Sequence, residues 1–372
     1  MKEDFNLMDR EEKMDKGQAV TRRRLLIGGG ATAAGVVMGA GMGGTVFALG
    51  NGQPALGLMS GRSPITYTIA QEDGNGPINF TATRWGVYGA DLGHTFVHRG
   101  RLYMVFGDTF GPNGSDWRSN TLARVIPTIG PQHGLFFDEM ITDQPGHAKA
   151  LMQAQAGEAS LIPTYGVSVG SRMFLHYMSV NSWGAPGHWT LNYSGLAYSD
   201  DDGQNWTRDT DMTWPGDSNF GQVAILEYQG YLYFFGIPGG RYGGVQLARV
   251  KPQSILDKTA YAYWDGSSWQ ANNPAAAVTI VPAPVGELSV RWSPFYRKWL
   301  MMYLNDPGYR TVLRTADQFT GPWSEEKVIL TGQDYPQLYA PYMLPLWNDG
   351  PDIYYTMSLF GPYCVYLMST RF

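Results

Sequence analysis

The run VAILEYQGYLYFF, residues 223–235, has the pattern of a β-hairpin. Two apolar and aromatic segments flank Gln229-Gly230; such segments favour strands, and glycine favours the tight turn between them. The same pattern recurs at four other places, beginning near residues 91, 160, 287 and 339. A hairpin that recurs about every 50 to 70 residues predicts a repeat of small sheets.

A third strand follows four of the five hairpins. These third strands are predicted at residues 121–125, 195–199, 245–250 and 310–315, and the last unit ends at residues 366–369. About four strands per repeat are typical of a propeller blade, so we predict an all-β, five-bladed β-propeller. A strand near residues 65–69 is expected to complete the last blade and close the ring. The alternative architecture is a β-sandwich or jelly roll.

The segment SDDDGQNW, residues 199–206, matches the pattern S-x-D-x-G-x-x-W. It resembles the Asp-box turn of sialidase-type propellers. That turn is structural, with its tryptophan packed between strands. The match therefore favours blades and says nothing about catalysis.

The composition excludes several classes of function. Charged residues are 16% of the chain, below the roughly 25% of an average domain. The net charge of −5 argues against binding of nucleic acid through bulk charge. A single cysteine, Cys364, excludes an intrachain disulfide and a cysteine-based metal cluster, and the six histidines lack zinc-site spacing. We therefore expect neither a metal nor an organic cofactor.

The N-terminus has the pattern of an export signal. Arg22-Arg23-Arg24 precedes Leu25-Leu26 and an uncharged Gly/Ala/Val stretch that extends to about Ala48. Residues 1–48 thus resemble a twin-arginine signal peptide, with a retained membrane anchor as the alternative. We expect residues 49–372 to form a single catalytic propeller. The twin-arginine translocase would export this propeller, which would then be secreted or held in the cell envelope. The membrane would be contacted only through an uncleaved signal.

Two aspartates frame the first predicted hairpin. Asp91 lies where it begins and Asp108 where its second strand ends, and the turn near residues 99–100 should return both to the same rim. Glycosidases use such a pair of carboxyl groups: one protonates the leaving oxygen, and the other attacks carbon or activates water. The alternative is structural, with Asp108 capping a turn and Asp91 solvated.

Five further polar residues are candidates for substrate contacts. Glu158 and Glu287 each precede an inner strand and are expected to point into the same cavity as the aspartates. Arg118, Asn120 and Arg241 could donate hydrogen bonds to sugar hydroxyls. The alternative for each acid is a structural role, and for each arginine a surface ion pair.

Aromatic residues near predicted strand ends suggest the class of substrate. Trp292 and Tyr339 are the stacking candidates, and Trp183 and Trp189 occupy similar positions. Aromatic rings offer flat apolar faces to the C–H groups of sugars. Most aromatic residues of the chain are nevertheless expected to pack between blades.

The ordered set of motifs resembles one family. Asp91-Leu92-Gly93, residues 106–110 (FGDTF) and residues 117–120 (WRSN) are similar to the actinobacterial domain of unknown function 4185, over roughly residues 65–372. Members of that family are assigned as endo-D-arabinanases, glycoside hydrolase family 183, which cut the D-arabinan of mycobacterial-type arabinogalactan and lipoarabinomannan. The resemblance implies a five-bladed propeller in which Asp91 and Asp108 are the catalytic acids.

The sequence therefore predicts an exported hydrolase of D-arabinan. Three other functions stay open at this point: a non-catalytic glycan-binding propeller, a sialidase-like hydrolase, and a structural envelope protein that docks partners. A sialidase-like enzyme would need an arginine cluster and a tyrosine nucleophile.

Overall fold

The computed structural model describes residues 55–56, 79–126, 130–131 and 134–371. The predicted signal peptide, residues 1–48, lies outside these residues, as does the strand predicted near residues 65–69. Among the described residues, no helix has the length and apolar character that a membrane span requires.

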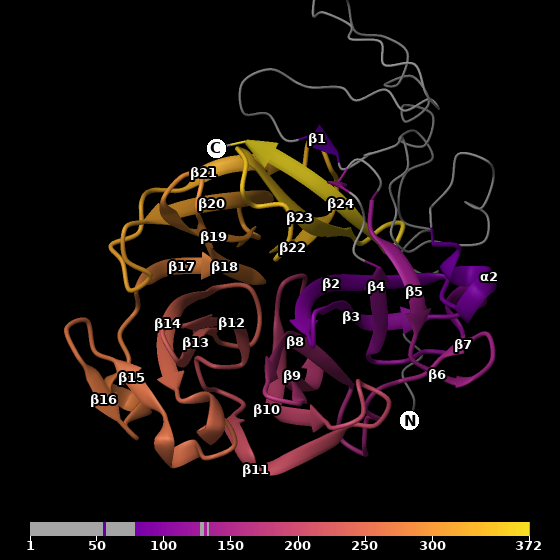
Figure 1. Ribbon diagram of the computed structural model, residues 1–372, viewed down its shortest axis with the longest axis horizontal. Coiled ribbons are helices and arrows are strands. Elements are labelled where there is room, and N and C mark those ends of the chain that lie inside the picture. Colours follow the sequence, from indigo (N-terminus) through magenta and orange to yellow (C-terminus); the bar gives the residue numbers. More distant parts are fainter. Residues whose placement is uncertain (1–54, 57–78, 127–129, 132–133, 372) are drawn as a thin grey trace, which may run out of the picture. The chain divides into compact units, whose positions relative to one another are not determined.

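Five antiparallel sheets of the described residues form the blades of a propeller (Figure 1). Blade one contains β2 (Gly89–His98), β3 (Arg101–Phe110), β4 (Thr121–Ile126) and β5 (Phe136–Met140). Blade two contains β8 (Ser160–Val169), β9 (Arg172–Trp183), β10 (Trp189–Ser199) and β11 (Thr207–Pro215). Blade three contains β12 (Gln222–Tyr228), β13 (Tyr231–Ile237), β14 (Gly243–Val250), β15 (Ala262–Trp264) and β16 (Trp269–Ala271), and β17 (Val281–Val285) pairs with β14.

The two remaining blades follow the same order. Blade four contains β18 (Leu288–Ser293), β19 (Lys298–Asn305), β20 (Arg310–Ala316) and β21 (Lys327–Thr331). Blade five contains β22 (Leu338–Met343), β23 (Asp352–Leu359), β24 (Cys364–Arg371) and β1 (Ala55–Leu56). The remaining short elements lie outside these sheets, before, between or within the blades: α2 (Thr81–Trp85), η3 (Pro112–Gly114), β6 (Thr142–Gln144), β7 (His147–Ala148), η5 (Pro252–Ser254), η6 (Lys258–Ala260) and η7 (Pro274–Ala276).

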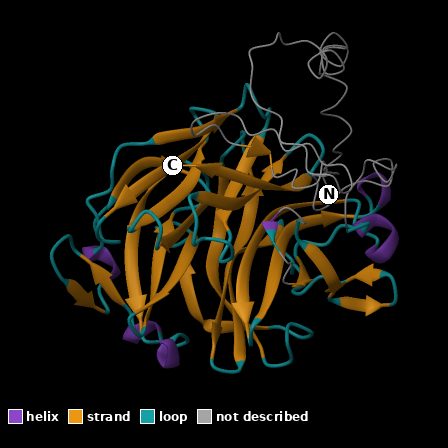
Figure 2. Ribbon diagram, turned by 45° about the horizontal axis from the view of Figure 1, so that its top comes forward, coloured by secondary structure: helices purple, strands orange, loops and turns teal. Residues whose placement is uncertain are grey.

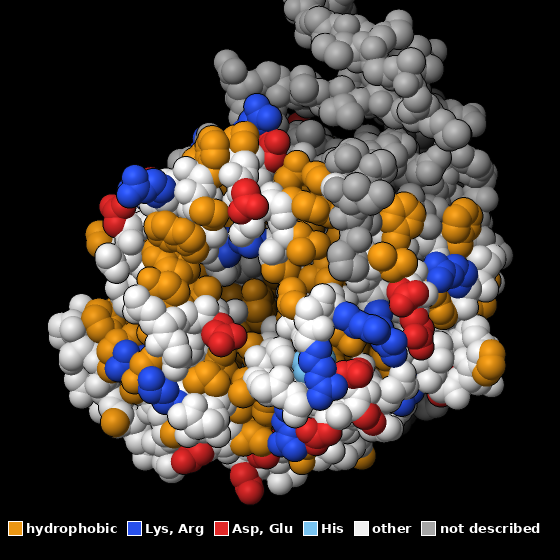
Figure 3. Space-filling model, in the orientation of Figure 1, with side chains coloured by type: hydrophobic (Ala, Val, Ile, Leu, Met, Phe, Trp, Pro, Cys, Tyr) orange, Lys and Arg blue, Asp and Glu red, His pale blue; other side chains and the backbone are white. Residues whose placement is uncertain are grey.

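The first strands of the blades form a closed ring. β2 contacts β8, β8 contacts β12, β12 contacts β18, β18 contacts β22, and β22 contacts β2 (Figure 1). In the space-filling view, apolar side chains gather around a hollow at the centre of this ring (Figure 3). The predicted five-bladed propeller is confirmed.

A segment near the N-terminus closes the ring. β1 pairs with β24, with Ala55 opposite Ser369 and Leu56 opposite Met368. Among the described residues, the strand that completes the last blade is therefore β1. A strand that precedes blade one in the sequence thus completes blade five.

The apolar runs become strands because both sides of each blade are covered. Trp214, at the end of β11, is 1% exposed and its ring lies 6.2 Å from that of Phe220 and 6.0 Å from that of Phe234. Burial of large aromatic side chains contributes much of the stability of a protein core. Strands covered on both faces can be apolar throughout, and strands covered on one face alternate apolar with polar residues, so both kinds occur in the blades. The Asp-box segment is a turn between β10 and β11, in which Trp206 Nε1 donates to the Gly203 carbonyl at 2.9 Å.

Loops gather at the two ends of the strands (Figure 2). One end carries the turns between first and second strands, such as Arg99-Gly100. The other end carries the loops that precede the inner strands and those that join second and third strands. Since Asp91 and Asp108 lie at this second end, we call it the acid face. Hydrogen bonds between such loops, for example from Arg241 to Glu287, place them together.

Candidate active site

Asp91 and Asp108 lie on adjacent strands of blade one. Ala90 is opposite Thr109 and Leu92 is opposite Phe106, so Asp91 faces both Gly107 and Asp108 across a β-bulge. A Cβ atom on Gly107 would lie 2.5 Å from Asp91 Oδ1, so only glycine leaves room for this carboxyl group. The hairpin brings the two acids to one rim, as its turn position predicted.

Asp91 is anchored by blade five. Its Oδ2 accepts hydrogen bonds from Tyr339 Oη at 2.9 Å and from Tyr363 Oη at 3.1 Å. Its Oδ1 is buried and has no hydrogen-bond partner among the described residues. Burial, together with the negative charge of Asp108, raises the pKa of Asp91 to about 8, although the tyrosine hydroxyls act in the opposite direction. The Asp91 carboxyl is therefore mainly protonated at neutral pH.

Asp108 is anchored from the other side of the blade. Its Oδ1 accepts hydrogen bonds from Ser160 Oγ and Trp117 Nε1, each at 2.8 Å. Burial raises the pKa of Asp108 to about 6, while these two donors favour the charged form. Asp108 is therefore mainly ionised at neutral pH. The site combines one protonated and one ionised carboxyl group, the arrangement that acid–base chemistry needs.

Glu287 and Arg241 join this cluster. Glu287 Oε1 accepts from Arg241 Nε at 3.0 Å and from Arg241 Nη2 at 2.8 Å, and Arg241 Nη1 donates to Asp306 Oδ1 at 3.2 Å. The Arg241 guanidinium also lies 5.1 Å from the ring of Tyr339, which binds Asp91. Glu287 Oε2 is buried without a partner among the described residues. Three of the candidates from the sequence, Arg241, Glu287 and Tyr339, thus lie beside the acid pair.

Glu158 does not point toward the acid pair, contrary to our expectation. Arg208 of β11 forms two hydrogen bonds with its carboxylate, one of them from Nη1 at 3.0 Å, and Ser179 and Tyr193 donate to it as well. Burial acts to raise the pKa of Glu158, but the hydrogen bonds from Arg208, the Gln155 N–H and Ser179, together with the charge of Arg208, lower it below its usual range. Glu158 therefore ties the strands of blade two together.

Arg118 and Asn120 are also structural, which corrects their assignment to substrate. Arg118 is 5% exposed, and its Nη1 and Nη2 donate to the carbonyls of Ala148 and Gly86, each at 2.8 Å. Asn120 is fully buried, and its amide donates to the carbonyl of Leu161 at 2.9 Å and accepts from the Met152 N–H at 2.8 Å. Because these groups already have protein partners, they are not free to bind sugar hydroxyls.

Trp292 lies at the wrong end of its strand for the predicted role. It is near the end of β18, whereas Glu287 immediately precedes that strand. Five residues of extended chain span about 16 Å, so Trp292 belongs to the face opposite the acids. Its ring is 39% exposed and packs 5.3 Å from that of Trp299.

Four contributors to the site escaped the sequence analysis: Tyr363, Ser160, Trp117 and Asp306. Tyr363 lies between β23 and β24, and its carbonyl accepts from the Ala90 N–H at 3.0 Å. Only closure of the ring places this loop of the last blade beside the first. Trp117 belongs to the same WRSN motif as Arg118 and Asn120. Its place in that motif was the signal that could have identified it as a site residue.

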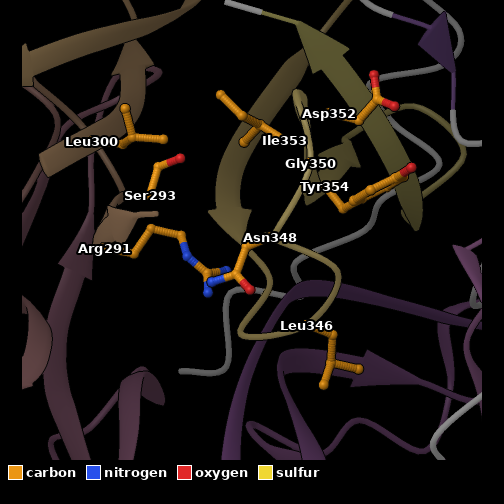
Figure 4. A pocket seen from close by; sticks show the side chains of 9 residues that line it. All are labelled: Arg291, Ser293, Leu300, Leu346, Asn348, Gly350, Asp352, Ile353 and Tyr354. Carbon is orange, nitrogen blue, oxygen red and sulfur yellow. The ribbon is translucent and has the colours of Figure 1, made fainter. Parts of the chain in front are cut away.

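A small cavity lies apart from the acids (Figure 4). It is lined by Arg291, Ser293, Leu300, Leu346, Asn348, Gly350, Asp352, Ile353 and Tyr354. The side chains of Arg291 and Asn348 point toward each other, and the volume of about 10 Å³ suits one water molecule. Because its residues come from the ends of inner strands and the turns after them, the cavity belongs to the opposite face. Among the described residues, no group of three His, Cys, Asp or Glu side chains is placed to hold a metal ion.

Comparison with known proteins shows which family the chain matches. The family model described as "Domain of unknown function (DUF4185)" matches residues 76–369. "Notoamide biosynthesis cluster protein J" of Aspergillus sp. (strain MF297-2) is 31% identical over 304 residues, covering 74% of this chain and 80% of that protein. Protein J' of Aspergillus versicolor is 31% identical over 292 residues, covering 72% and 79%. A putative hydrolase from Bacteroides ovatus shares the fold, with a TM-score of 0.57 at 14% identity, covering 78% of this chain and 87% of that one.

Proposed function

The chain belongs to the DUF4185 family, and on this premise we propose that it is a glycoside hydrolase with Asp91 as general acid and Asp108 as its ionised partner. One observation carries the proposal: two neighbouring carboxyl groups have different pKa values because their surroundings differ. Burial and the charge of Asp108 raise the pKa of Asp91 to about 8, whereas the pKa of Asp108 rises only to about 6. A pair of acids tuned apart in this way suits hydrolysis of a glycosidic bond.

The protonated Asp91 would donate its proton to the leaving glycosidic oxygen. As the bond breaks, positive charge develops on the sugar ring, and the Asp108 carboxylate would stabilise it. Asp108 then either bonds to the anomeric carbon or takes a proton from the attacking water. The product anomer distinguishes these two roles, since the first retains and the second inverts the configuration.

The proposed substrate is the D-arabinan of mycobacterial-type arabinogalactan and lipoarabinomannan, cut within the chain at D-arabinofuranosyl linkages. The family resemblance supports this choice. Trp117, which is 43% exposed and donates a hydrogen bond to Asp108, adds an aromatic ring face beside the two aspartates. We also propose that a twin-arginine signal exports the protein to where such a glycan would be found. The names of the Aspergillus relatives give a biosynthetic cluster and no reaction, so they do not choose among substrates.

A sialidase-like mechanism fits the described residues less well. It needs cationic side chains free to bind a carboxylate, but Arg241, the arginine beside Asp91, is already bound by Glu287 and Asp306. It also needs a tyrosine nucleophile. Burial and the nearby charge of Asp91 raise the pKa of Tyr339 well above its usual range, which keeps this hydroxyl protonated. The site therefore favours a neutral glycan.

The proposal is tested with purified protein and mycobacterial arabinogalactan. Wild type, Asp91→Asn and Asp108→Asn are incubated with the polysaccharide, and released oligosaccharides are measured by chromatography. We expect release by wild type and a loss of at least 100-fold in each variant. Release at the wild-type rate by either folded variant would exclude the role given to that residue. Binding without release by wild type would favour the glycan-binding alternative.

A further inference from the structure

The hairpin of β9 and β10 projects beyond the rest of blade two at the acid face. The inner strand β8 begins at Ser160, which pairs with Val180, so the end of β9 has no partner on that side. There, Trp183 pairs with Trp189 across the hairpin. Residues 181–186 are exposed to solvent. Because Ser160 itself binds Asp108, the projecting tip rises beside the acid pair.

The tip is held rigidly by the neighbouring blade. The Gly187 carbonyl accepts from the Arg241 N–H at 3.0 Å. The ring of His188 stacks on that of Tyr242 at 4.1 Å, with 8° between the planes. Tyr242 Oη donates to Asp306 Oδ2 at 3.1 Å. A surface that is already ordered loses little conformational entropy when it binds a ligand.

A continuous set of contacts joins the tip to Asp91. Tyr339 donates to Asp91, and the Arg241 guanidinium lies 5.1 Å from the ring of Tyr339 and 5.6 Å from that of Trp189. The ring of Trp189 in turn lies 5.8 Å from that of Trp183. Arg241, the central member of this set, is also the residue whose backbone binds the tip.

The exposed groups of the tip have the chemistry that recognises sugars. Trp183 and Tyr242 are each 39% exposed, so each presents part of a flat apolar ring to solvent. Ser182 and Thr190 lie beside Trp183 and share a hydrogen bond at 2.7 Å, and both are exposed. Apolar ring faces next to hydroxyl groups match the alternating C–H and O–H surfaces of a sugar.

We propose that Trp183, Tyr242 and the tip of the β9–β10 hairpin form a second glycan subsite, remote from the cleaved bond. This inference rests on the proposed function and deepens it. Sugar residues of a long chain stack on the two rings while another part of the same chain lies over Asp91 and Asp108. Binding at a remote subsite helps only substrates long enough to reach it, so the protein favours polymers over short oligosaccharides.

The test compares Trp183→Ala with a matched control, Trp292→Ala. Both tryptophans are 39% exposed and each packs edge-on against a second tryptophan, but Trp292 is on the opposite face. Binding of mycobacterial arabinogalactan and of its short oligosaccharides is measured by calorimetry, in an Asp91→Asn background that prevents hydrolysis. We expect Trp183→Ala to weaken binding of the polymer 3- to 10-fold, corresponding to about 0.6 to 1.4 kcal/mol. Binding of the short oligosaccharides should stay within twofold, and Trp183→Phe should restore most of the affinity.

Thermal unfolding shows whether each variant is folded. Equal polymer binding by Asp91→Asn with and without a folded Trp183→Ala change would overturn the subsite, as would an equal loss caused by Trp292→Ala. Absence of polymer binding by Asp91→Asn would also overturn it. If the polymer binds through Trp183 but is never cleaved, the subsite stands and the hydrolase proposal fails. If cleavage occurs and Trp183→Ala has wild-type affinity and rates on both substrates, only the subsite fails.

Discussion

Tyr339 donates a hydrogen bond to Asp91 at 2.9 Å although 248 residues separate them in the chain. The bond crosses from the last blade to the first, and Tyr363, 272 residues from Asp91, adds a second one at 3.1 Å. The environment of the proposed acid therefore depends on the contact between the last blade and the first. A defect in the last blade should change the chemistry of a residue near the start of the fold.

Activity should depend on pH through both aspartates. Catalysis requires Asp108 ionised and Asp91 protonated, and their pKa values are about 6 and about 8. The rate constant kcat/KM should rise as the pH increases through about 6 and fall as it increases through about 8, with a maximum near 7. Initial rates on arabinogalactan between pH 4 and 10 test this. A profile flat from pH 5 to 9 would contradict the assignment of both groups.

Tyr363→Phe should move the alkaline limb of this profile. The tyrosine hydroxyl bonds to the Asp91 carboxylate and acts to lower its pKa, so its removal should raise the pKa of Asp91 further. We expect the limb to move upward by about half a unit to one unit. Tyr354→Phe, on the opposite side of the fold, is the control and should leave the limb in place. A downward shift in Tyr363→Phe would show that the hydroxyl does not act on Asp91 as described.

Asp91→Asn should stabilise the protein at alkaline pH. The pKa of Asp91 rises from 3.8 to about 8 on folding, so the folded state binds more protons than the unfolded state between these values. Stability therefore falls as the pH rises from about 4 to about 8, by up to several kcal/mol, and asparagine removes this loss. The difference in Tm between Asp91→Asn and wild type should be several degrees larger at pH 9 than at pH 5.

The control for this comparison is Asp317→Asn, because the Asp317 side chain is 80% exposed. Its difference in Tm from wild type should stay nearly constant with pH. If the Asp91 and Asp317 variants show the same pH dependence, the Asp91 carboxyl does not titrate with a raised pKa.

Gly107→Ala should lower activity without unfolding the protein. The new Cβ atom would lie 2.5 Å from Asp91 Oδ1 and would push the carboxyl group out of place. Misplacement of a catalytic group by about 1 Å costs on the order of 100-fold in rate, and we expect a loss of this size in kcat. Gly350→Ala is the control, since nothing lies within 4 Å of the added atom. Full activity in Gly107→Ala would mean that the Asp91 position tolerates movement.

Glu158→Gln and Glu287→Gln should separate a structural acid from a functional one. Each carboxylate is 6% exposed, precedes an inner strand and is paired with an arginine. Glu158→Gln leaves Arg208 without its charged partner and should reduce the free energy of unfolding by about 2 kcal/mol, with kcat/KM unchanged at 25 °C. Glu287→Gln should lower kcat/KM at least 10-fold, because Arg241 packs on the tyrosine that binds Asp91. The reverse pattern in rates and unfolding would overturn this division of roles.

The sequence alone predicted the blades and the acid pair because both depend on local spacing. A strand, a tight turn and a second strand determine which residues return to the same rim, so Asp91 and Asp108 could be paired from the position of Arg99-Gly100. Their distinct pKa values could not be predicted in this way, since each results from burial between different blades. Blade five provides the donors to Asp91, and Ser160 of blade two donates to Asp108.

The partners of the remaining polar residues were decided by tertiary structure. Glu158 and Glu287 have the same sequence context, yet one meets Arg208 within its own blade and the other meets Arg241 of the preceding blade. From the sequence, Arg118 was expected to donate hydrogen bonds to substrate. In the structure it donates instead to the carbonyls of Gly86 and Ala148. A period of two decides which way a strand residue points, but a hydrogen-bond partner is set by distance in space, which the order of residues does not contain.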